Sequence, residues 1–410
     1  MRILFLSHYF PPEGNAPATR VFEMCRRWVR AGHHVTVITC APNVPNGKVY
    51  AGYRNRLRQR EDVEGIEVIR VWTYLAPNKG KVRRIVNYLS YFVCASFAGL
   101  FVQRPDVVIA TSPQFFCGWA GVIVSRLRRL PFILEIRDIW PESIVTVGAM
   151  KKSRMVMFLE RLERRLYASA RHIVTVGEGY RRQLEARGVQ PARISVITNG
   201  VDRTAPAPSQ RDGPLLDRLG LKDGFVCSYI GTIGMASGLD VVLRAARNLK
   251  TSRRGDIRFL LVGDGAVRAE LERVAKAEQL DNVIFAGLQS RTRLNAFFSI
   301  SDACLVHLRK KELFETVLPS KLLEAMAMAK AVVLGVKGSA AELIRESGAG
   351  ICIEPENENE LIAAVERLAA DRALAESMGA SGRCYVLKHF DLDVLARNYL
   401  TVVEQTAKPA

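Results

Sequence analysis

Short apolar segments alternate with longer amphipathic segments along most of this chain of 410 residues, and this alternation most constrains its fold. The apolar segments are nearly free of polar residues, which is typical of strands that are buried on both faces. Such strands, with helices between them, form a parallel sheet that helices cover. In the first half, the predicted strands are residues 3–7, 35–39, 66–72, 107–111, 132–136, 173–176 and 194–197.

The alternation stops over residues 202–218, which are rich in proline and glycine and are predicted to be a linker. It then starts again, with strands predicted at residues 225–230, 258–262, 283–286, 303–307 and 331–336. We therefore expect two α/β, doubly wound parallel-sheet domains, residues 1–201 and 219–385, that face each other across a cleft. Residues 386–410 are expected to form a C-terminal helix that packs back on the first domain.

Positive charge is concentrated in the first half of the chain. Residues 1–200 contain 31 basic and 14 acidic side chains, whereas residues 201–410 contain 28 and 27. Such an excess predicts an anionic partner: nucleic acid, a phospholipid surface or a phosphorylated substrate. No RRM or zinc-finger pattern is present, and aromatic residues do not alternate with the basic ones, which argues against nucleic acid.

The eight cysteines form no C-x-x-C pair, so the sequence indicates neither a zinc site nor a disulfide framework. This pattern fits a reducing cytosol best. The apolar run after Met1 is too short to predict a signal peptide.

Residues 85–102 contain no charge, and basic residues precede them. Eighteen residues are close to the lower limit for a helix that spans a membrane, but several polar residues dilute the segment. A buried or interfacial helix is favoured, and a membrane-spanning helix stays open as the alternative. Basic residues beside an apolar helix are also what a helix in a headgroup layer requires.

One predicted helix start in the second half has the chemistry of an anion site. Pro319 and Ser320 mark the start, which places Lys321 in the first turn beside free backbone N–H groups. An ammonium and several N–H donors at a helix N-terminus suit a diphosphate. Glu324, one turn further on, could accept two hydroxyls of a ribose. The structural alternative is a capped amphipathic helix with a solvated lysine and glutamate.

Small residues follow two other strands of this half and would let a phosphate or sugar approach the backbone. A tight turn explains the second loop equally well, because Arg268 breaks a G-x-G-x-x-G pattern. Arg309, at the end of a further strand, would add positive charge unless it belongs to a solvated face. The glycine-rich loops offer Gly231, Thr232, Gly234, Gly263 and Gly265.

In the first half, Gly14 and Asn15 follow the first strand, and Arg137 and Asp138 follow strand 132–136. Asp138 could position or deprotonate an acceptor hydroxyl, and Arg137 could hold a phosphate. A structural Arg–Asp pair is the alternative. These four residues are the candidate acceptor site.

Together these motifs resemble the retaining glycosyltransferases of family four, which have the GT-B fold of two facing Rossmann-like domains. Within that family, Arg137–Ser143 and Phe314–Lys321 are similar to the N-acetyl-fucosamine transferases of O-antigen and capsule synthesis. The resemblance covers almost the whole chain. It depends on Ala31-Gly32-His33-His34-Val35, Thr198-Asn199-Gly200-Val201-Asp202, Leu261-Val262-Gly263-Asp264-Gly265, Asn282-Val283-Ile284-Phe285-Ala286-Gly287, Ser301-Asp302-Ala303 and the helix with Glu324.

The resemblance implies a UDP-sugar donor in the second domain, bound as a substrate, with no metal or other cofactor and with retention. Leu288 would hold the base, Glu324 the ribose, and Lys321 with the helix N-terminus the diphosphate. The catalytic residues implied are Asp138, Lys321, Glu315 and Thr316.

The chain departs from the family pattern at two places. The family's paired glutamates lie eight positions apart, which places the first at Thr316, beside Glu315. The arginine and lysine of the first loop of the second domain correspond to Thr232 and Ser237. We expect Lys321 and Arg309 to compensate for these losses.

The implied acceptor is a glycan linked to a polyprenyl diphosphate. The enzyme would be cytoplasmic and peripherally associated with the anionic inner face of the cell membrane, without binding nucleic acid. A sugar-nucleotide epimerase, which shares the two-domain architecture, and a nucleic-acid-binding protein are the alternatives.

Overall fold

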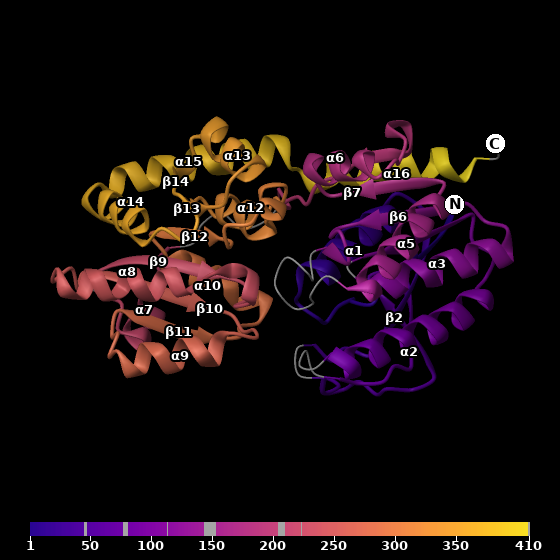
Figure 1. Ribbon diagram of the computed structural model, residues 1–410, viewed down its shortest axis with the longest axis horizontal. Helices are drawn as coiled ribbons and strands as arrows, with labels where there is room; N and C mark the ends of the chain where they lie inside the picture. The colour runs from indigo at the N-terminus through magenta and orange to yellow at the C-terminus, as the bar shows by residue number, and fades with distance from the viewer. Residues whose placement is uncertain are drawn as a thin grey trace. The chain divides into compact units, whose positions relative to one another are not determined.

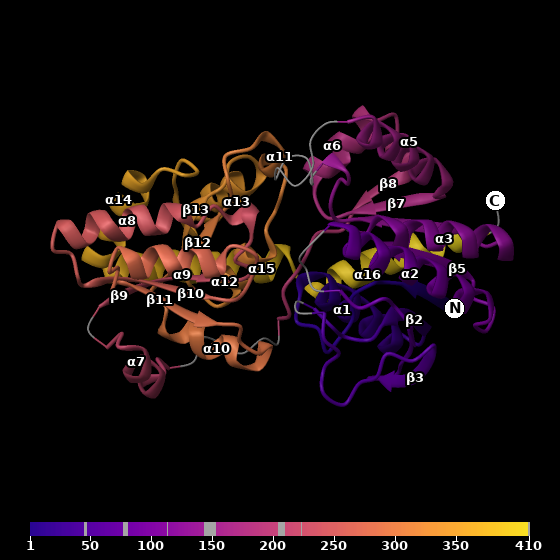
Figure 2. The same ribbon diagram turned by 60° about the horizontal axis from the view of Figure 1, so that its bottom comes forward.

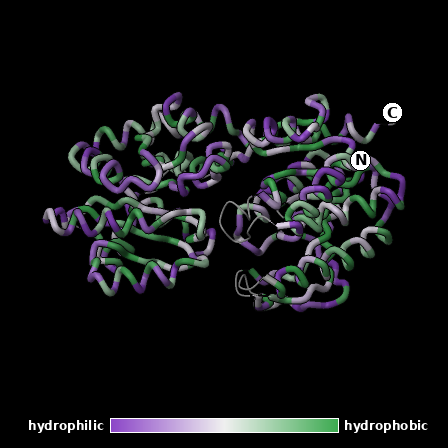
Figure 3. The backbone as a smooth tube through the Cα atoms, viewed as in Figure 1, coloured by the Kyte–Doolittle hydropathy of each residue, from purple (hydrophilic) through white to green (hydrophobic). Residues whose placement is uncertain are grey.

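The computed structural model describes residues 1–44, 47–76, 81–112, 114–142, 153–203, 210–222 and 224–408. The chain divides into two compact units, each an α/β domain built on one sheet (Figure 1). Unit 1 comprises Met1–Asn199 and Leu392–Ala410, and unit 2 comprises Gly200–Asp391. Figure 3 shows hydrophobic residues concentrated in the central strands of the units.

Unit 1 contains an eight-stranded sheet in the order β3-β4-β2-β1-β5-β6-β7-β8. Every pair of neighbours is parallel except β3 and β4, which form an antiparallel edge. The seven predicted strands are present within one residue at each end. The strands are β1 Arg2–Leu6, β2 His34–Cys40, β3 Arg58–Val63, β4 Ile66–Val71, β5 Val107–Thr111, β6 Phe132–Ile136, β7 His172–Thr175 and β8 Ile194–Val196.

Helices cover both faces of this sheet. On one face α1 (Ala16–Arg30) and α16 (Leu392–Ala407) lie side by side (Figure 2), and the Trp28 indole donates to the Ala396 carbonyl at 3.0 Å. On the other face, the Tyr91 hydroxyl of α2 (Lys81–Leu100) donates to the Ile38 carbonyl of β2 at 2.8 Å. This second face also carries α3 (Phe115–Arg128) and α5 (Arg154–Ser169), and α6 (Glu178–Ala186) connects β7 to β8.

The predicted apolar segment 85–102 lies mostly in α2, which packs against α3 through Gly99 and Val124. Ala95 and Tyr91 are buried on this side of the helix. Among the residues described, no helix combines the length and the apolarity that crossing a membrane requires.

Unit 2 contains six parallel strands in the order β11-β10-β9-β12-β13-β14, with one apolar core on each face. The strand order reverses between β9 and β12, so the loops beyond these strands meet at a topological switch point, where ligands of such sheets bind. The strands are β9 Phe225–Ile230, β10 Ile257–Val262, β11 Val283–Gly287, β12 Ala303–His307, β13 Ala331–Gly335 and β14 Gly350–Cys352. The helices are α7 Gly213–Leu219, α8 Asp240–Thr251, α9 Arg268–Ala277, α10 Arg291–Ile300, α11 Glu312–Glu315, α12 Ser320–Ala327, α13 Ser339–Ser347, α14 Glu358–Ala370 and α15 Arg372–His389.

Two segment boundaries differ from the prediction. The predicted linker 202–218 overlaps α7, because Asp212 caps a helix there and Leu215 and Leu216 are buried in the core of unit 2. Residues 204–209 of that linker lie outside the described part of the chain. The single helix expected over 386–410 is two helices, since α15 ends within unit 2 and α16 belongs to unit 1.

Candidate functional site

The glycine loops of unit 2 pack backbone against backbone beyond the ends of β9 and β10. A Cβ on Gly263, whose φ is +141°, would lie 1.9 Å from the Gly231 carbonyl oxygen. A Cβ on Gly265 would lie 2.3 Å from the Ile233 carbonyl oxygen. Gly263 and Gly265 are therefore required by the packing of the two loops, and a ligand is not needed to explain them.

Lys321 projects from the start of α12 toward the loop after β9. A Cβ on Gly231 would lie 3.2 Å from the lysine Nζ, so the glycine leaves room for the ammonium. Nζ lies 4.1 Å from the centroid of the Tyr229 ring and donates a hydrogen bond to the Tyr229 hydroxyl. That hydroxyl donates in turn to the Thr232 carbonyl at 2.7 Å. Tyr229 therefore holds the charge of Lys321 at the end of β9.

The N-terminus of α12 has no side-chain cap. Pro319 occupies the N-cap position in an extended conformation, and Ser320 is the first helical residue, as predicted. Lys321 is the second residue of this helix, so its side chain starts from the turn whose backbone N–H groups lack intrahelical partners, a combination that suits an anionic oxygen.

Glu324 lies one turn further along α12 and is half-buried. Burial raises the pKa of its carboxyl group, while the charges of Arg291 and Lys321 oppose the shift. Leu288, after β11, is 59 % exposed. The structure thus groups Lys321, Gly231 and Glu324, whereas no described contact links Leu288 to them.

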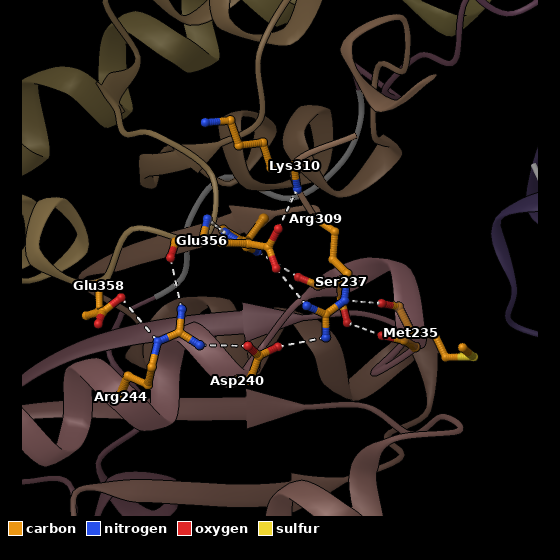
Figure 4. A network of polar contacts seen from close by, with 10 residues as sticks. Met235, Ser237, Asp240, Arg244, Arg309, Lys310, Glu356 and Glu358 are labelled. Atoms are coloured by element: carbon orange, nitrogen blue, oxygen red, sulfur yellow. Dashed lines mark hydrogen bonds and ion pairs between the residues drawn. The ribbon is translucent and has the colours of Figure 1, made fainter. Parts of the chain in front are cut away.

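Arg309 belongs to a network of ion pairs in unit 2. Its guanidinium donates to the Met235 carbonyl at 3.0 Å, to Glu356 at 2.7 Å and to Asp240 at 2.9 Å (Figure 4). Asp240 also pairs with Arg244 at 2.7 Å. This network gives Arg309 a structural role, while N–H donors of its guanidinium beyond these three bonds leave a contact with the donor as a prediction.

The remaining predicted residues of unit 2 lie around α11 and in the loop after β9. The Thr316 hydroxyl donates to the Leu313 carbonyl at 2.8 Å, at the end of α11. Glu315 is exposed, and its backbone oxygen packs against Gly338. A Cβ on Gly234 would meet only the Thr232 methyl, at 3.7 Å. No described contact joins Glu315 or Thr316 to Lys321.

In unit 1, Arg137 and Asp138 follow β6, beside the end of β5. The Arg137 guanidinium is buried, and within the described residues its Nε and Nη1 atoms have no hydrogen-bond partner. Burial lowers the pKa of Arg137 to about 10, with Glu135 opposing the shift. Asp138 lines a cavity of about 20 Å³ with Trp140, which is large enough for one water molecule but not for a sugar. Arg137 thus carries a buried guanidinium with two nitrogen atoms that lack hydrogen-bond partners among the described residues. A phosphate of the predicted acceptor would require such donors.

The loop after β1 differs from the expectation for Asn15. The Asn15 side chain caps α1 by accepting from the Ala18 N–H at 2.9 Å, whereas Gly14 is exposed with no atom near its missing Cβ. The neighbouring Glu13 is buried and accepts from the N–H groups of Asn43 and Val44 at 2.8 and 3.1 Å. Glu13 therefore ties this loop to the loop after β2.

Glu13 makes the stability of unit 1 depend on pH. Burial raises the pKa of Glu13 to about 7, above the ordinary value of 4.5. The folded state therefore keeps a proton that the unfolded state has lost, and stability falls as pH rises from about 4.5 to about 7. We expect Glu13→Gln to raise the free energy of unfolding by about 2 kcal/mol at about pH 8 and by much less at about pH 4.5.

Urea unfolding followed by tryptophan fluorescence measures this difference, because all four tryptophans lie in unit 1. An equal effect of the substitution at both pH values would contradict the assignment.

Comparisons with known proteins show the family of this chain. Residues 15–200 match the family described as Glycosyl transferase 4-like domain, and residues 217–384 match Glycosyl transferases group 1. The chain is a glycosyltransferase with the GT-B fold. It is 26 % identical over 381 residues to a putative colanic acid biosynthesis glycosyl transferase, WcaI, of Escherichia coli, covering 90 % of this chain and 92 % of the relative.

Two solved structures share the fold of this glycosyltransferase. Sucrose-phosphate synthase from Thermosynechococcus elongatus has a TM-score of 0.76 at 19 % identity, covering 98 % of both chains. Anabaena HepE in complex with UDP-glucose has a TM-score of 0.72 at 16 % identity, covering 99 % of this chain and 100 % of that one.

Two histidines of the glycosyltransferase were not predicted. His307 ends β12, where Nδ1 donates to the Ser237 carbonyl at 2.7 Å and Nε2 accepts from the Glu356 N–H at 2.8 Å. This arrangement requires the neutral ring, in agreement with a pKa that burial lowers. His307 thus supports the loops at the carboxyl end of the unit 2 sheet. The available signal was a histidine at the end of an apolar strand.

The second histidine, His8, follows β1 and is buried. Its ring meets the rings of Tyr9, Tyr88 and Tyr91 edge-on at 5.0, 5.6 and 4.8 Å. Burial lowers its pKa to about 4, and Nδ1 has no partner among the described residues. A neutral imidazole with an unpaired Nδ1 atom at this edge of the sheet makes His8 a further candidate for the predicted acceptor site.

Proposed function

We propose that this glycosyltransferase moves a sugar, such as an N-acetylated deoxyhexosamine, from a UDP-sugar to a lipid-linked oligosaccharide in the synthesis of a bacterial envelope polysaccharide. The observation that carries the proposal is the Lys321 ammonium, which Tyr229 holds at the uncapped N-terminus of α12. This arrangement places positive charge where a departing diphosphate needs it. The names of the relatives, WcaI and a Salmonella lipopolysaccharide 1,2-N-acetylglucosaminetransferase, support an envelope glycan.

Lys321 and the first-turn N–H groups would hold the two phosphates, and Glu324 would accept two hydroxyls of the ribose. Charge that develops on the leaving diphosphate is then neutralised by groups already in place, without a metal ion. We propose that the acceptor attacks from the face that the diphosphate leaves, so that the anomeric configuration is retained. The UDP-glucose bound to HepE supports a nucleotide sugar as the donor.

Unit 1 would bind the acceptor through the buried Arg137 guanidinium, with Asp138 near the attacking hydroxyl. A polyprenyl diphosphate offers phosphate oxygens to the Nε and Nη1 atoms of Arg137, which have no hydrogen-bond partner among the described residues. The positive excess of residues 1–200 supports a cytoplasmic, peripheral location on the anionic face of the membrane.

The experiment is a mass-spectrometric screen of nucleotide sugars with a polyprenyl-diphosphate sugar as acceptor. The expected result is one product heavier by one sugar, with retained configuration by NMR and with activity that persists in EDTA. Conversion of the donor in the absence of acceptor would instead indicate an epimerase. Absence of transfer with every donor would contradict the proposal.

A further inference from the structure

Helix α2 carries an apolar stripe that the described residues leave uncovered. Apart from the adjacent Ile85 and Val86, its members follow one another at intervals of three or four residues, which places them on one side of the helix. Val93 and Phe97 at its centre are 61 % and 65 % exposed. The α2 stripe comprises Val82, Ile85, Val86, Leu89, Val93, Phe97 and Phe101, where Phe101 directly follows the helix.

This stripe is unusual for a helix that faces water. The opposite side of α2 already packs in unit 1, where Tyr91 and Ala95 are buried. A surface helix normally turns charged residues outward, yet residues 85–102 contain no charge on any side. A continuous apolar surface of this kind marks an interaction site. Figure 1 shows α2 on the outside of unit 1, beside α3.

Basic residues stand at both ends of the α2 stripe. Arg83 and Arg84 are exposed at its start. At its end, Arg128 donates to the carbonyls of Gly99 and Val102, both at 3.0 Å. Arg104 is exposed and lies close enough to Arg128 for its charge to join burial in lowering the Arg128 pKa.

A further exposed apolar side chain lies among the basic residues near the C-terminal end of the α2 stripe. Leu127 of α3 is 67 % exposed, and it is flanked in sequence by Arg126 and Arg128, with Arg129 one residue further on. An apolar stripe with cations at its ends matches an anionic lipid layer, in which acyl chains lie beneath charged headgroups. A protein partner would need an apolar groove edged by acidic residues to match this surface. The described residues of unit 1 offer no observation that favours such a partner over a lipid layer.

We propose that the α2 stripe docks on an anionic phospholipid bilayer, with α2 parallel to the membrane and its exposed side chains in the headgroup layer. This inference deepens the proposed function, on which it rests, because it names the surface that meets the membrane. Another side of the same helix adjoins the candidate acceptor site, since Tyr88 and Tyr91 of α2 contact the His8 ring. An acceptor anchored in the bilayer by its lipid would therefore reach that site along α2.

The test uses the full chain and sedimentation with vesicles of phosphatidylcholine containing about 30 % phosphatidylglycerol. We expect the double variant Val93→Asp/Phe97→Asp to reduce the partition coefficient between vesicles and water at least tenfold. The variant removes two apolar side chains from the headgroup layer and adds two negative charges that the anionic lipids repel. The matched control is Val394→Asp on α16, which covers the other face of the sheet and is also exposed. The control should bind within about twofold of the unchanged protein, and about 0.5 M salt should weaken the binding of both.

Circular dichroism melts should show the same fold in all three proteins, because the substituted side chains are exposed. Equal vesicle binding by the double variant and the unchanged chain would overturn the α2 assignment, as would failure of the unchanged chain to bind. Light scattering that shows a dimer, dissociated by the double variant, would overturn it in favour of a second copy of the chain.

Transfer to a short-chain, water-soluble acceptor separates this inference from the proposed function. The double variant should keep that activity and lose most of its activity on acceptor embedded in vesicles. A chain that binds vesicles through α2 but transfers no sugar to either acceptor would refute the proposed function alone.

Discussion

Replacement of Lys321 by alanine is expected to lower kcat/KM for sugar transfer by about a thousandfold. The ammonium is the one cation that the described contacts place beside Gly231 at the uncapped start of α12. Its loss would leave the charge on the departing diphosphate to the backbone N–H groups alone. Binding of UDP, measured by calorimetry, should weaken as well, because the diphosphate is present in the product.

The control for this prediction is Lys276→Ala, which removes an exposed lysine from α9 and should leave both measurements unchanged. A Lys321→Ala variant that melts like the unchanged protein yet keeps full activity would refute the site. A Tyr229→Phe variant adds a graded test. It keeps the ring beneath the ammonium but removes the hydroxyl that accepts from it, so we expect a smaller loss than for Lys321→Ala.

Local signals were sufficient to predict most of the fold and the start of α12. The buried strands are apolar throughout, and Pro319 with Ser320 marks a helix start whatever lies around it. The edge strand β3 was missed because its sequence is mostly charged and its side chains are alternately exposed and half-buried, so no apolar period reveals it. Helix α7 was missed because prolines and glycines surround it and, of its three leucines, only Leu215 and Leu216 are fully buried in the core.

The partners of charged residues could not be read from the sequence. Arg309 pairs with Asp240 and Glu356, which lie 69 and 47 positions away, and this structural network was not predicted. Tyr229 has no role in the sequence prediction, because an aromatic residue within an apolar strand carries no sign of a polar contact, although its hydroxyl accepts from Lys321 across 92 positions. Such pairings depend on which strands lie side by side, and spacing along the chain does not encode this.

Glu135→Gln is expected to destabilise unit 1 by about 3–5 kcal/mol, the cost of leaving a buried charge without its partner. Glu135 accepts from the Arg20 Nε at 2.6 Å, and the two side chains are 1 % and 3 % exposed. The Arg20 fork also donates to the carbonyls of Ile197 and Thr198 at 2.7 and 2.6 Å, which joins α1 and β6 to the end of β8. Burial alone would raise the pKa of Glu135, but Arg20 and Arg137 lower it by more than burial raises it. The carboxylate is therefore charged in the folded state.

The amide that Glu135→Gln introduces keeps the shape of the side chain but removes the charge that two buried guanidinium groups face. Urea unfolding followed by tryptophan fluorescence reports on unit 1 directly. The matched control is Glu64→Gln, which breaks an exposed pair with Arg30 at 3.4 Å and should cost less than about 1 kcal/mol. The double variant Arg20→Met/Glu135→Leu should recover part of the loss, because apolar side chains need no counter-charge, whereas Arg137 would still lack one. A loss as small as that of the control would show that the Arg20–Glu135 pair does not hold unit 1 together.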